Sequence, residues 1–393
     1  MNKKTIRDID IKGKRLLIRV DFNVPLDDRL NITDDTRIKA ALPTIIYALE
    51  NGAIVLLMSH LGRPDGKVVE KLRLNPVKNR LQELLGKPVI KLDDCIGSEV
   101  RRTVERLKPG DVALLENLRF HPEEEANDPN FSKELASLAD IYINDAFGTA
   151  HRAHSSTEGI AKFLPAYAGF LIEKEIEYLG KVLESPAKPF ALILGGAKIS
   201  DKILVIENLI KKIDALLIGG GMAYTFLKAQ GKNIGNSKLE KDRIEYAKDL
   251  LGKVKATNLK LSLPVDNVVV DKIDASSNEE IVGEDIPDGL IGVDIGQKTI
   301  ANFRDILKNT KTILWNGPLG IFEIDKFGKG TKEIANFIVT LKATTVIGGG
   351  DTASAISKLG LENKMSHVST GGGASLEFLE GKVLPGIACL LNK

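Results

Sequence analysis

The sequence lacks the features that would assign it to several special classes of protein. Its 393 residues include only Cys95 and Cys389, too few for a disulfide framework and without metal-ligand spacing. No apolar run approaches the length of a membrane span, and the N-terminal residues lack the apolar segment of a signal peptide. Lysine and arginine (55) nearly balance aspartate and glutamate (53), which gives no reason to expect nucleic acid or a membrane as partner. We therefore expect a cytoplasmic protein and, without an obvious apolar interface stripe, a monomer.

What the sequence does contain is a regular alternation of short apolar runs and longer helical segments. The segment 36–52 is typical, because Ile38, Leu42, Ile45 and Leu49 share one helical face and Gly52 follows as a stop. Continuously apolar strands that alternate with helices indicate parallel sheets covered on both faces, so the predicted class is α/β. The expected strands are RLLIRVDF, AIVLLMSH, VALLENL, IYINDAF, FALILGG, ALLIGGG, NVVVD, KTILWNG and TVIGGG.

The two halves of the chain differ in composition, which favours two domains. Thirteen of the fifteen arginines lie within residues 1–152, whereas twenty-six of the thirty-six glycines lie from Gly180 onward. A chain of this length also exceeds what one core usually organises. We place the boundary at an amphipathic helix in 170–190 that ends before Pro186 and Pro189, and we predict a hinge there. The alternative is one more helix of a single large sheet.

Four glycine-rich turns are expected where strands of the second half meet helices, at 195–196, 219–221, 348–350 and 371–373. Glycine has no Cβ, so the backbone can approach a phosphate, and a helix that starts there offers unpaired N–H groups to an anion. One such turn would be explained by steric needs alone. Four in one half favour a phosphate-rich ligand.

The familiar nucleotide fingerprints are absent. No Gly-Lys pair is followed by Ser or Thr, so there is no P-loop, and no expected strand leads into G-x-G-x-x-G, which counts against a nicotinamide enzyme. The segment after Gly196 instead supplies Lys198 and Lys202, which we place at i and i+4 on the first turns of a helix. Such a pair is ordinarily typical of a solvated face, but beside a glycine turn we favour phosphate binding.

Asp351 follows three glycines directly at an expected helix start. The ordinary role of an aspartate there is to cap the helix. A nucleotide phosphate chain also needs Mg²⁺, which usually takes only one or two protein carboxylates. We predict that Asp351 serves the metal, and both roles are compatible.

In the first half, polar residues stand where the expected strands end. The set consists of Asp21, Asn23, Arg37, His60, Arg63, Arg119, Arg152, His151 and His154. A single arginine is ordinarily a surface ion pair, but four at strand exits favour an anion pocket, since the planar guanidinium suits phosphate and carboxylate groups. Asp21 and Asn23 lie two apart in extended chain, so both face one side and could hold a hydroxyl group. The histidines lack zinc-ligand spacing.

Taken together, these motifs resemble phosphoglycerate kinase along essentially the whole chain. Ten segments occur in the family's order: RVDFNVP, TDDTRI, SHLGRP, LLENLRF, FGTAHRAHSS, GGAKISDK, IGGGMAYTF, WNGPLGIFE, IGGGDT and STGGGASLEFLEGKVLPGI. The resemblance implies reversible, Mg²⁺-dependent phosphoryl transfer from 1,3-bisphosphoglycerate to ADP, giving 3-phosphoglycerate and ATP. It also implies two Rossmann-like domains with a cleft between them, joined by a hinge helix that lets them close. The implied divisions are 1–170 for phosphoglycerate, 171–188 for the hinge, 189–376 for the nucleotide and 377–393 for a segment that returns to the first domain.

The resemblance also implies roles for individual positions. For phosphoglycerate binding it implies Asp21, Asn23, Arg37, His60, Arg63, Arg119 and Arg152. For nucleotide binding it implies Lys198, Lys202, Gly219, Gly220, Gly296, Glu323, Gly349, Gly350, Asp351 and Thr352, with Glu323 on the ribose and Asp351 on Mg²⁺. For stabilising the transferring phosphoryl group it implies Arg37, Lys198, Gly350 and Gly373. One departure is Gln297, where the family commonly has proline.

Two other interpretations remain open from the residues alone. One is a different ATP-dependent carboxylate or sugar kinase on a two-domain α/β fold. The arginines favour a small phosphorylated acid over a neutral sugar, which needs fewer fixed cations. The other is a nucleotide-sensing protein without transfer activity, which the combination of Arg37, Lys198, Lys202 and Asp351 disfavours.

Overall fold

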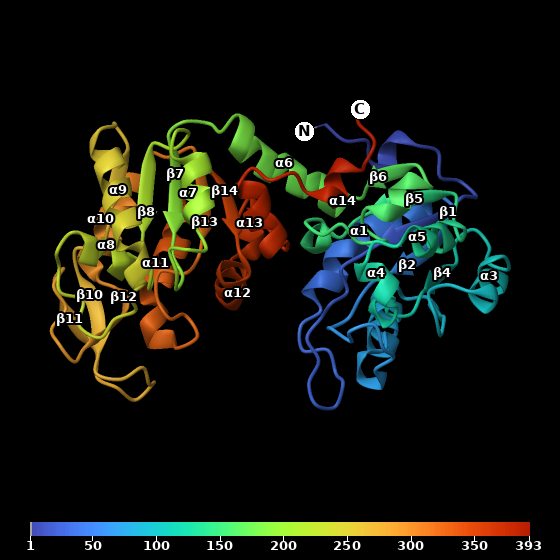
Figure 1. Cartoon of the computed structure of the whole chain (residues 1–393), viewed down its shortest axis with the longest axis horizontal. Helices are drawn as coiled ribbons and strands as arrows, with labels where there is room; N and C mark the ends of the chain where they lie inside the picture. Colours follow the sequence, from blue (N-terminus) through green and yellow to red (C-terminus); the bar gives the residue numbers. More distant parts are fainter. Residues whose placement is uncertain (1) are drawn as a thin grey trace. The chain divides into compact units, whose positions relative to one another are not determined.

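The computed structural model describes residues 2–393, and they form two compact units (Figure 1). The first unit comprises residues 1–177 and 383–393, and the second comprises residues 178–382. Helix α6 (Phe170–Glu184) runs through the junction at residues 177–178. Each unit is built on a six-stranded sheet in which every neighbouring pair of strands is parallel. The predicted α/β class with parallel sheets is confirmed.

The sheet of the first unit has the strand order β3-β4-β2-β1-β5-β6. Its strands are β1 (Arg15–Arg19), β2 (Ile54–Met58), β3 (Ile90–Lys91), β4 (Val112–Leu114), β5 (Ile141–Asn144) and β6 (Ala166–Ala168). Its helices are α1 (Thr36–Glu50), α2 (Asn75–Leu85), α3 (Ser98–Val104), α4 (Pro122–Glu125), α5 (Pro129–Ala136) and α14 (Pro385–Ala388). Helix α1 forms as predicted, and its Ile38 and Ile45 pack with Leu16 and Ile18 of β1 in one buried cluster.

The sheet of the second unit has the strand order β15-β14-β13-β7-β8-β9. Its strands are β7 (Phe190–Leu194), β8 (Ala215–Ile218), β9 (Lys260–Ser262), β13 (Thr312–Asn316), β14 (Thr344–Gly348) and β15 (His367–Val368). The helices of this unit are α7 (Ile203–Leu209), α8 (Ala223–Ala229), α9 (Ile244–Lys255), α10 (Gln297–Leu307), α11 (Lys329–Ile338), α12 (Gly350–Lys358) and α13 (Gly373–Leu379). Residues of α10, α11 and α12 pack on Ile193, Ile313 and Ile347 on one face of the sheet, and Leu192, Leu314 and Val346 on the other face are buried as well.

One predicted strand belongs to a different sheet. NVVVD forms β10 (Asn267–Val270), which pairs antiparallel with β11 (Glu280–Val282) and β12 (Ile291–Ile295). Val269 packs in a cluster with Tyr224, whereas Val268 and Val270 pack with Phe327 on the other face. Both faces of β10 are therefore covered, and a strand covered on both faces is continuously apolar whichever way it pairs. The apolar run alone could not reveal the antiparallel pairing.

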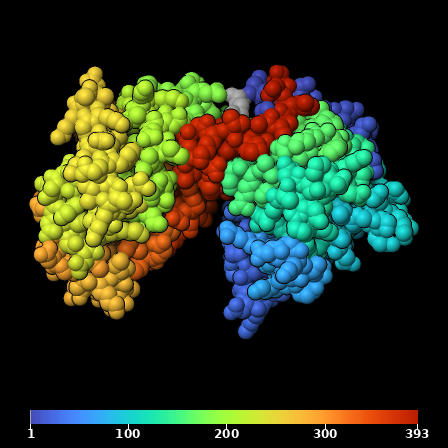
Figure 2. Space-filling view, viewed as in Figure 1, coloured from blue at the N-terminus to red at the C-terminus, as the bar shows by residue number. Residues whose placement is uncertain are grey.

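The last residues of the chain pack within the first unit. Figure 2 shows these C-terminal residues, in red, beside N-terminal residues in blue. The amide of Leu391 donates to the Ala166 carbonyl (3.0 Å), and the amide of Lys4 donates to the Leu391 carbonyl (2.8 Å). The buried Asn144 side chain, at the end of β5, donates to the Gly386 carbonyl (2.8 Å) and accepts from the Ala146 amide (3.1 Å). One side chain thus ties the C-terminal segment to the end of a central strand.

We expect Asn144→Ala to lower the free energy of unfolding by about 2 kcal/mol or more, because it leaves a buried carbonyl and a buried N–H unpaired. Asn51→Ala is the matched control, since Asn51 is exposed and makes one hydrogen bond, to the Tyr47 carbonyl (2.8 Å). Urea unfolding followed by circular dichroism measures both variants. Equal losses in the two variants would contradict a structural role for Asn144.

Candidate functional site

In the first unit, polar side chains stand at the carboxyl ends of four adjacent strands. The strands are neighbours in the order β4-β2-β1-β5. Asp21 and Asn23 follow β1, His60 follows β2, Arg119 lies after β4 in the turn Leu118–Phe120 (η3), and Arg152 lies after β5. Carboxyl ends of parallel strands open at one edge of the sheet, where ligands of open α/β sheets bind. The topology therefore brings these residues to a common edge.

A continuous chain of hydrogen bonds joins five residues at this edge. Arg37 Nη1 lies 2.6 Å from Asp21 Oδ2, and Asp21 Oδ1 accepts from the Asn23 amide (3.2 Å). Asn23 Oδ1 accepts from the Gly62 amide (2.8 Å), and the Gly62 carbonyl accepts from Arg119 Nη1 (2.9 Å). The side chains that we predicted to share one pocket are thus connected through the backbone of Gly62.

The remaining two arginines of the predicted set differ in their surroundings. Arg63 is exposed, and within residues 2–393 its guanidinium makes no hydrogen bond or ion pair. Arg152 is half-buried and its Nε lies 3.3 Å from His151 Nε2. Arg152 also acts electrostatically on His154: burial and the charges of Arg119, Arg19 and Arg152 lower the pKa of His154 to about 4.

Sequence reasoning missed Arg19, the most buried cation at this edge. Its side chain is 1% exposed, although it is the last residue of β1. Arg19 Nε donates to Ser156 Oγ (2.8 Å), Nη1 donates to the Val20 carbonyl, and Nη2 lies 3.2 Å from His60 Nδ1. Ser156 in turn donates through its amide (2.9 Å) and its hydroxyl to the fully buried Glu124 carboxylate. The Glu124 carboxylate, which is linked to Arg19 by two successive hydrogen bonds through Ser156, thus offsets the buried charge of Arg19.

Arg19 fixes the protonation of His60. A guanidinium only donates hydrogen bonds, so His60 Nδ1 must accept and the ring proton must be on Nε2. Burial, and after it the charges of Arg19, Arg119, Arg37 and Arg152, hold the pKa of His60 well below its usual range. His60 is therefore a neutral donor through Nε2 across the physiological pH range.

In the second unit, two of the four glycine turns and the turn at Gly317 pack backbone against backbone. A Cβ at Gly195 would lie 2.1 Å from the Pro318 carbonyl oxygen, and a Cβ at Gly220 would lie 2.7 Å from the Gly196 nitrogen. Gly317, after β13, has φ +99 and approaches the Gly195 carbonyl in the same way. These turns need glycine because their backbones touch one another. This steric requirement explains the glycines without a ligand.

The glycines at the starts of α12 and α13 have a different environment. A Cβ at Gly350 or Gly372 would meet nothing within 4 Å, and Gly349 caps α12 with φ +83. Gly373 is the first residue of α13. Gly372 has φ +52 and Gly349 has φ +83, so the left-handed backbone explains these two glycines, whereas neither contact nor backbone conformation explains Gly350. Open N–H groups at a helix start suit an anion.

The predicted placement of the lysine pair on a helix is wrong. Helix α7 begins only at Ile203, Lys202 is its N-cap, and Lys198 lies in the irregular segment before it. The Glu240 carboxylate accepts the amides of Ile199 and Ser200, which satisfies these N–H groups outside a helix. The half-buried Glu240 carboxylate, from a segment remote in the chain, thus replaces the hydrogen bonds that a helix would have made here.

The two lysines consequently have separate environments. Lys198 is exposed, with no hydrogen bond or ion pair from its side chain to any residue in 2–393. Lys202 is largely buried and donates to Asn316 Oδ1 at the end of β13. Burial lowers the pKa of Lys202, and the carboxylates of Asp201 and Asp351 oppose this shift.

Asp351 does not cap α12, because Gly349 occupies the cap position and Asp351 lies in the first turn. Its carboxylate is exposed and unpaired within residues 2–393. The neighbouring Thr352 is buried, and its Oγ1 accepts from the Gly317 amide (2.6 Å), which ties the start of α12 to the turn after β13. Asp351 therefore remains free for a ligand.

Asn316 was not predicted from the sequence, yet it lies at the centre of this edge. It is 1% exposed, and its Oδ1 accepts from Lys202 while its Nδ2 is buried without a partner in residues 2–393. A Cβ on Gly349 would lie 3.0 Å from Asn316 Oδ1. The only sequence signal was its position before a Gly-Pro pair at a strand end.

The other predicted nucleotide residues lie in separate segments of the second unit. Gly219 follows β8 and packs under Leu319, where a Cβ would lie 2.7 Å from that side chain. Gly296 is the N-cap of α10 and is crowded by the Asp266 carboxylate, which accepts from the amide of Thr299 (2.8 Å). Glu323 is exposed, and its carboxylate has no ion pair within residues 2–393. Nothing in this unit connects Glu323 directly to Lys202 or Asp351.

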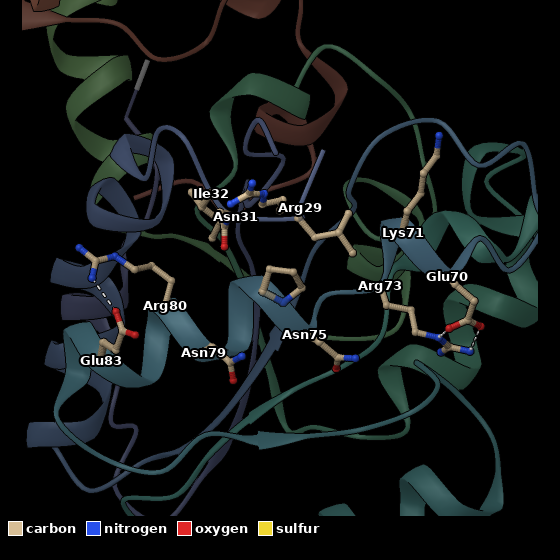
Figure 3. A pocket seen from close by; sticks show the side chains of 12 residues that line it. Arg29, Asn31, Ile32, Glu70, Lys71, Arg73, Asn75, Asn79, Arg80 and Glu83 are labelled. Atoms are coloured by element: carbon tan, nitrogen blue, oxygen red, sulfur yellow. Dashed lines mark hydrogen bonds and ion pairs between the residues drawn. The ribbon is translucent and has the colours of Figure 1, made fainter. Parts of the chain in front are cut away.

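A polar hollow of about 450 Å³ also lies in the first unit, between the loop at Arg29–Ile32 and helix α2 (Figure 3). Two of its three arginines are already paired: Arg73 pairs with Glu70 (2.8 Å), and Arg80 pairs with Glu83 (2.7 Å). None of the predicted substrate residues lines this hollow. It is separate from the edge formed by β4, β2, β1 and β5.

The first unit carries arginines at one strand edge. The second unit carries glycine-rich helix starts beside Lys202 and the free carboxylate of Asp351. Together these features define the class of protein as an α/β phosphotransferase. A sequence model described as phosphoglycerate kinase matches residues 6–382. The phosphoglycerate kinase of Gloeothece citriformis is 58% identical over 398 residues, covering 99% of each chain, and that of Moorella thermoacetica is 54% identical over 394 residues, covering 100% of each. The solved phosphoglycerate kinase structure from Coxiella burnetii superposes with a TM-score of 0.89 at 40% identity, covering 98% of each chain.

The chain belongs to the phosphoglycerate kinase family. It is an enzyme of glycolytic phosphoryl transfer that uses small-molecule substrates with ATP and ADP as co-substrates. Within residues 2–393, every helix is too short or too polar to cross a membrane.

The low pKa of His154 predicts a pH dependence of stability. The unfolded chain binds a proton at His154 near pH 6.5 and the folded chain only near pH 4, so this residue makes stability fall as pH drops between these values. We expect His154→Gln to flatten the stability profile from pH 6.5 to 4, measured by urea midpoints.

His121→Gln is a control of opposite sign. A hydrogen bond to Asp94 raises the pKa of His121, so this residue contributes stability below pH 6.5 that is lost as pH rises through the folded pKa. Its removal should steepen the acid side of the profile. Identical profiles for both variants would contradict the assigned shifts.

Proposed function

We propose that the chain transfers the acyl phosphate of 1,3-bisphosphoglycerate to ADP, yielding 3-phosphoglycerate and ATP, with Mg²⁺. The segment 1–170 would bind the phosphoglycerate, and the segment 377–393 would return to this first domain. The segment 189–376 would bind the nucleotide, and 171–188 would link the two. We further propose that the enzyme acts as a cytoplasmic monomer.

The observation that carries this proposal is the hydrogen-bonded chain from Arg37 through Asp21, Asn23 and Gly62 to Arg119. It holds two cations and two polar side chains around one strand edge, which suits a ligand with a phosphate, a hydroxyl and a carboxyl group. Arg63, exposed and unpaired within residues 2–393, has all its donors available for a phosphate. Neutral His60 adds an Nε2–H donor without adding charge.

In the second unit, Lys202 and Lys198 would bind the nucleotide phosphates. The buried Nδ2 of Asn316 has no partner within residues 2–393, and a phosphate oxygen beside Lys202 would satisfy it. The open space at Gly350 leaves room for further phosphate oxygens, and the backbone N–H groups of Gly349 and Gly373 would also bind phosphate. Gly219, Gly220 and Gly296 would border the adenine, Glu323 would contact the ribose, and Thr352 would hold the start of α12.

The chemistry needs no general base. The nucleophile is a phosphate oxygen of ADP in one direction and a carboxylate in the other, and both are ionised at neutral pH. Catalysis then depends on placing the reactants and on neutralising the charge of the transferring phosphoryl group. We assign these tasks to Arg37, Lys198 and the amides at Gly350 and Gly373. All four supply hydrogen-bond donors, and the two side chains also supply permanent positive charge.

Asp351 fits a magnesium ligand. Its carboxylate is exposed, unpaired within residues 2–393, and close enough to Lys202 to act on that pKa. Mg²⁺ prefers carboxylate and phosphate oxygens and usually takes one or two protein carboxylates. When bound, the ion would neutralise charge on the nucleotide phosphates. Asp351 would hold it beside the helix start that Thr352 ties down.

A coupled assay with ADP, Mg²⁺ and 1,3-bisphosphoglycerate tests the proposed reaction directly. ATP formation at a turnover typical of a metabolic enzyme is expected. Activity with another carboxylate or a sugar, but not with this substrate, would overturn the proposal.

We expect Arg37→Ala to lower kcat by more than about tenfold with the fold intact, because the loss of one donor to a developing anion typically costs about 10² to 10³ in rate. Arg29→Ala is the matched control, since Arg29 is an exposed arginine of a nearby loop that lines the separate hollow. Both variants are assayed at saturating substrate after circular dichroism. Near-normal turnover of Arg37→Ala would refute its assignment.

We expect Asp351→Asn to raise the Mg²⁺ concentration needed for half-maximal activity by about tenfold or more, since a neutral amide is a poorer ligand than a carboxylate. Asp305→Asn serves as the control, because Asp305 is an exposed helical aspartate paired with Lys308. Activity is titrated with Mg²⁺ at fixed free ADP. An unchanged midpoint for Asp351→Asn would exclude it as a ligand.

A further inference from the structure

Three potential metal ligands converge in the first unit, away from the residues assigned above. Asp94 and Cys95 lie in the loop after β3, and His121 lies between η3 and α4. One donor atom of each residue lies within 4.8 Å of the other two. Asp94 Oδ1 and His121 Nε2 are 2.7 Å apart, so these two donors already face each other.

An ion pair explains only part of this cluster. It accounts for Asp94 and His121. It does not account for the fully buried thiol of Cys95, which lies beside these two polar side chains. The carboxylates of Asp94 and Glu124 both place negative charge near this thiol. Their potential would attract a divalent cation to this position.

The donor set discriminates between metals. It offers one carboxylate oxygen, one imidazole nitrogen and one sulfur, which together suit Zn²⁺ and similar borderline-soft ions and do not suit Mg²⁺ or Ca²⁺. Three protein ligands leave one position of a tetrahedral ion for water. The partial exposure of His121 (26%) and Asp94 (52%) provides access from solvent.

We propose that Asp94, Cys95 and His121 form a binding site for a zinc-like divalent cation. On binding, the Cys95 S–H bond breaks, its proton passes to solvent, and a metal–sulfur bond forms. His121 binds through Nε2, which exchanges its contact with Asp94 Oδ1 for the metal.

The bound cation would cross-link the loop after β3 to the turn that carries Arg119. His121 is two residues from Arg119, and the Arg119 guanidinium also pairs with Glu125 at the end of α4 (3.1 Å). Occupancy should therefore stabilise this part of the first unit, because a ligand that binds only the folded state raises its stability. This proposal does not depend on the proposed reaction.

Cobalt titration of the untagged full chain tests the site. Co²⁺ bound to a thiolate gives a near-ultraviolet charge-transfer band, and we expect one equivalent per chain, displaced by Zn²⁺. Cys95→Ser should abolish the band, and His121→Gln should weaken binding by about tenfold or more. Cys389→Ser is the matched control, since Cys389 is the only other cysteine of the sequence, and it should retain the band.

Thermal unfolding provides the second readout. We expect Zn²⁺ to raise the Tm of the wild type and of Cys389→Ser, and to raise the Tm of His121→Gln clearly less at the same Zn²⁺ concentration. A band that is absent in the wild type, or that disappears in Cys389→Ser, would overturn the proposal. Equal Tm shifts in the wild type and His121→Gln would also overturn the proposal. Asp94 and His121 would then form only an ion pair beside the Cys95 thiol.

Discussion

The burial of Arg19 is the constraint on which the arginine-rich edge of the first unit depends. A guanidinium cannot lose its charge in a protein, so it needs hydrogen-bond acceptors and a compensating charge once water is removed. Arg19 finds them in the Val20 carbonyl, Ser156 and His60, and Glu124 offsets its charge through Ser156. Strand β1, strand β2, helix α4 and the segment at Ser156 are thereby held to one another. The position of His60 at the edge follows from this arrangement.

Much of the fold could be predicted from the sequence, because buried strands of a parallel sheet are long apolar runs that end in polar residues. The nine expected strands all form, and α1 ends where its pattern predicts. The short edge strands β3, β6, β9 and β15 carry too few residues to produce a pattern. The pairing of β10 was also beyond prediction, since its direction depends on partners distant in the chain.

The clustering of these polar residues was predictable where they directly follow a strand, as for Asp21 and Asn23 after β1, whereas Arg37 reaches the same edge from the first turn of α1. Arg19 escaped detection because it lies inside a strand, and a single arginine there does not reveal that Glu124 compensates it. Asn316 escaped for a similar reason. The helical placement of Lys198 failed because the Glu240 carboxylate, from a remote segment, satisfies the backbone that a helix would have used.

The glycine turns show why one residue type can serve two purposes within one unit. Gly195, Gly220 and Gly317 are required by the contact of one turn with the next, so a ligand is unnecessary to explain them. Gly350 and Gly372 have open space where a Cβ would be, so contact with the fold does not explain them. A count of glycines cannot separate these cases, whereas the space around each position can. Phosphate binding is therefore supported by Gly350 at the start of α12 rather than by the number of turns, because Gly372 is also required by its φ of +52.

The charges of the first unit suit a reaction without a proton relay. Its histidines His60 and His154 are held neutral by burial and by surrounding arginines, and the arginines themselves do not titrate. The charge of these arginines and of these two imidazoles is therefore constant across the physiological pH range. A phosphoryl transfer between groups that are already ionised needs this constancy more than it needs a base. The same arginines that we propose to bind a phosphate thus also help to keep the His60 and His154 imidazoles neutral.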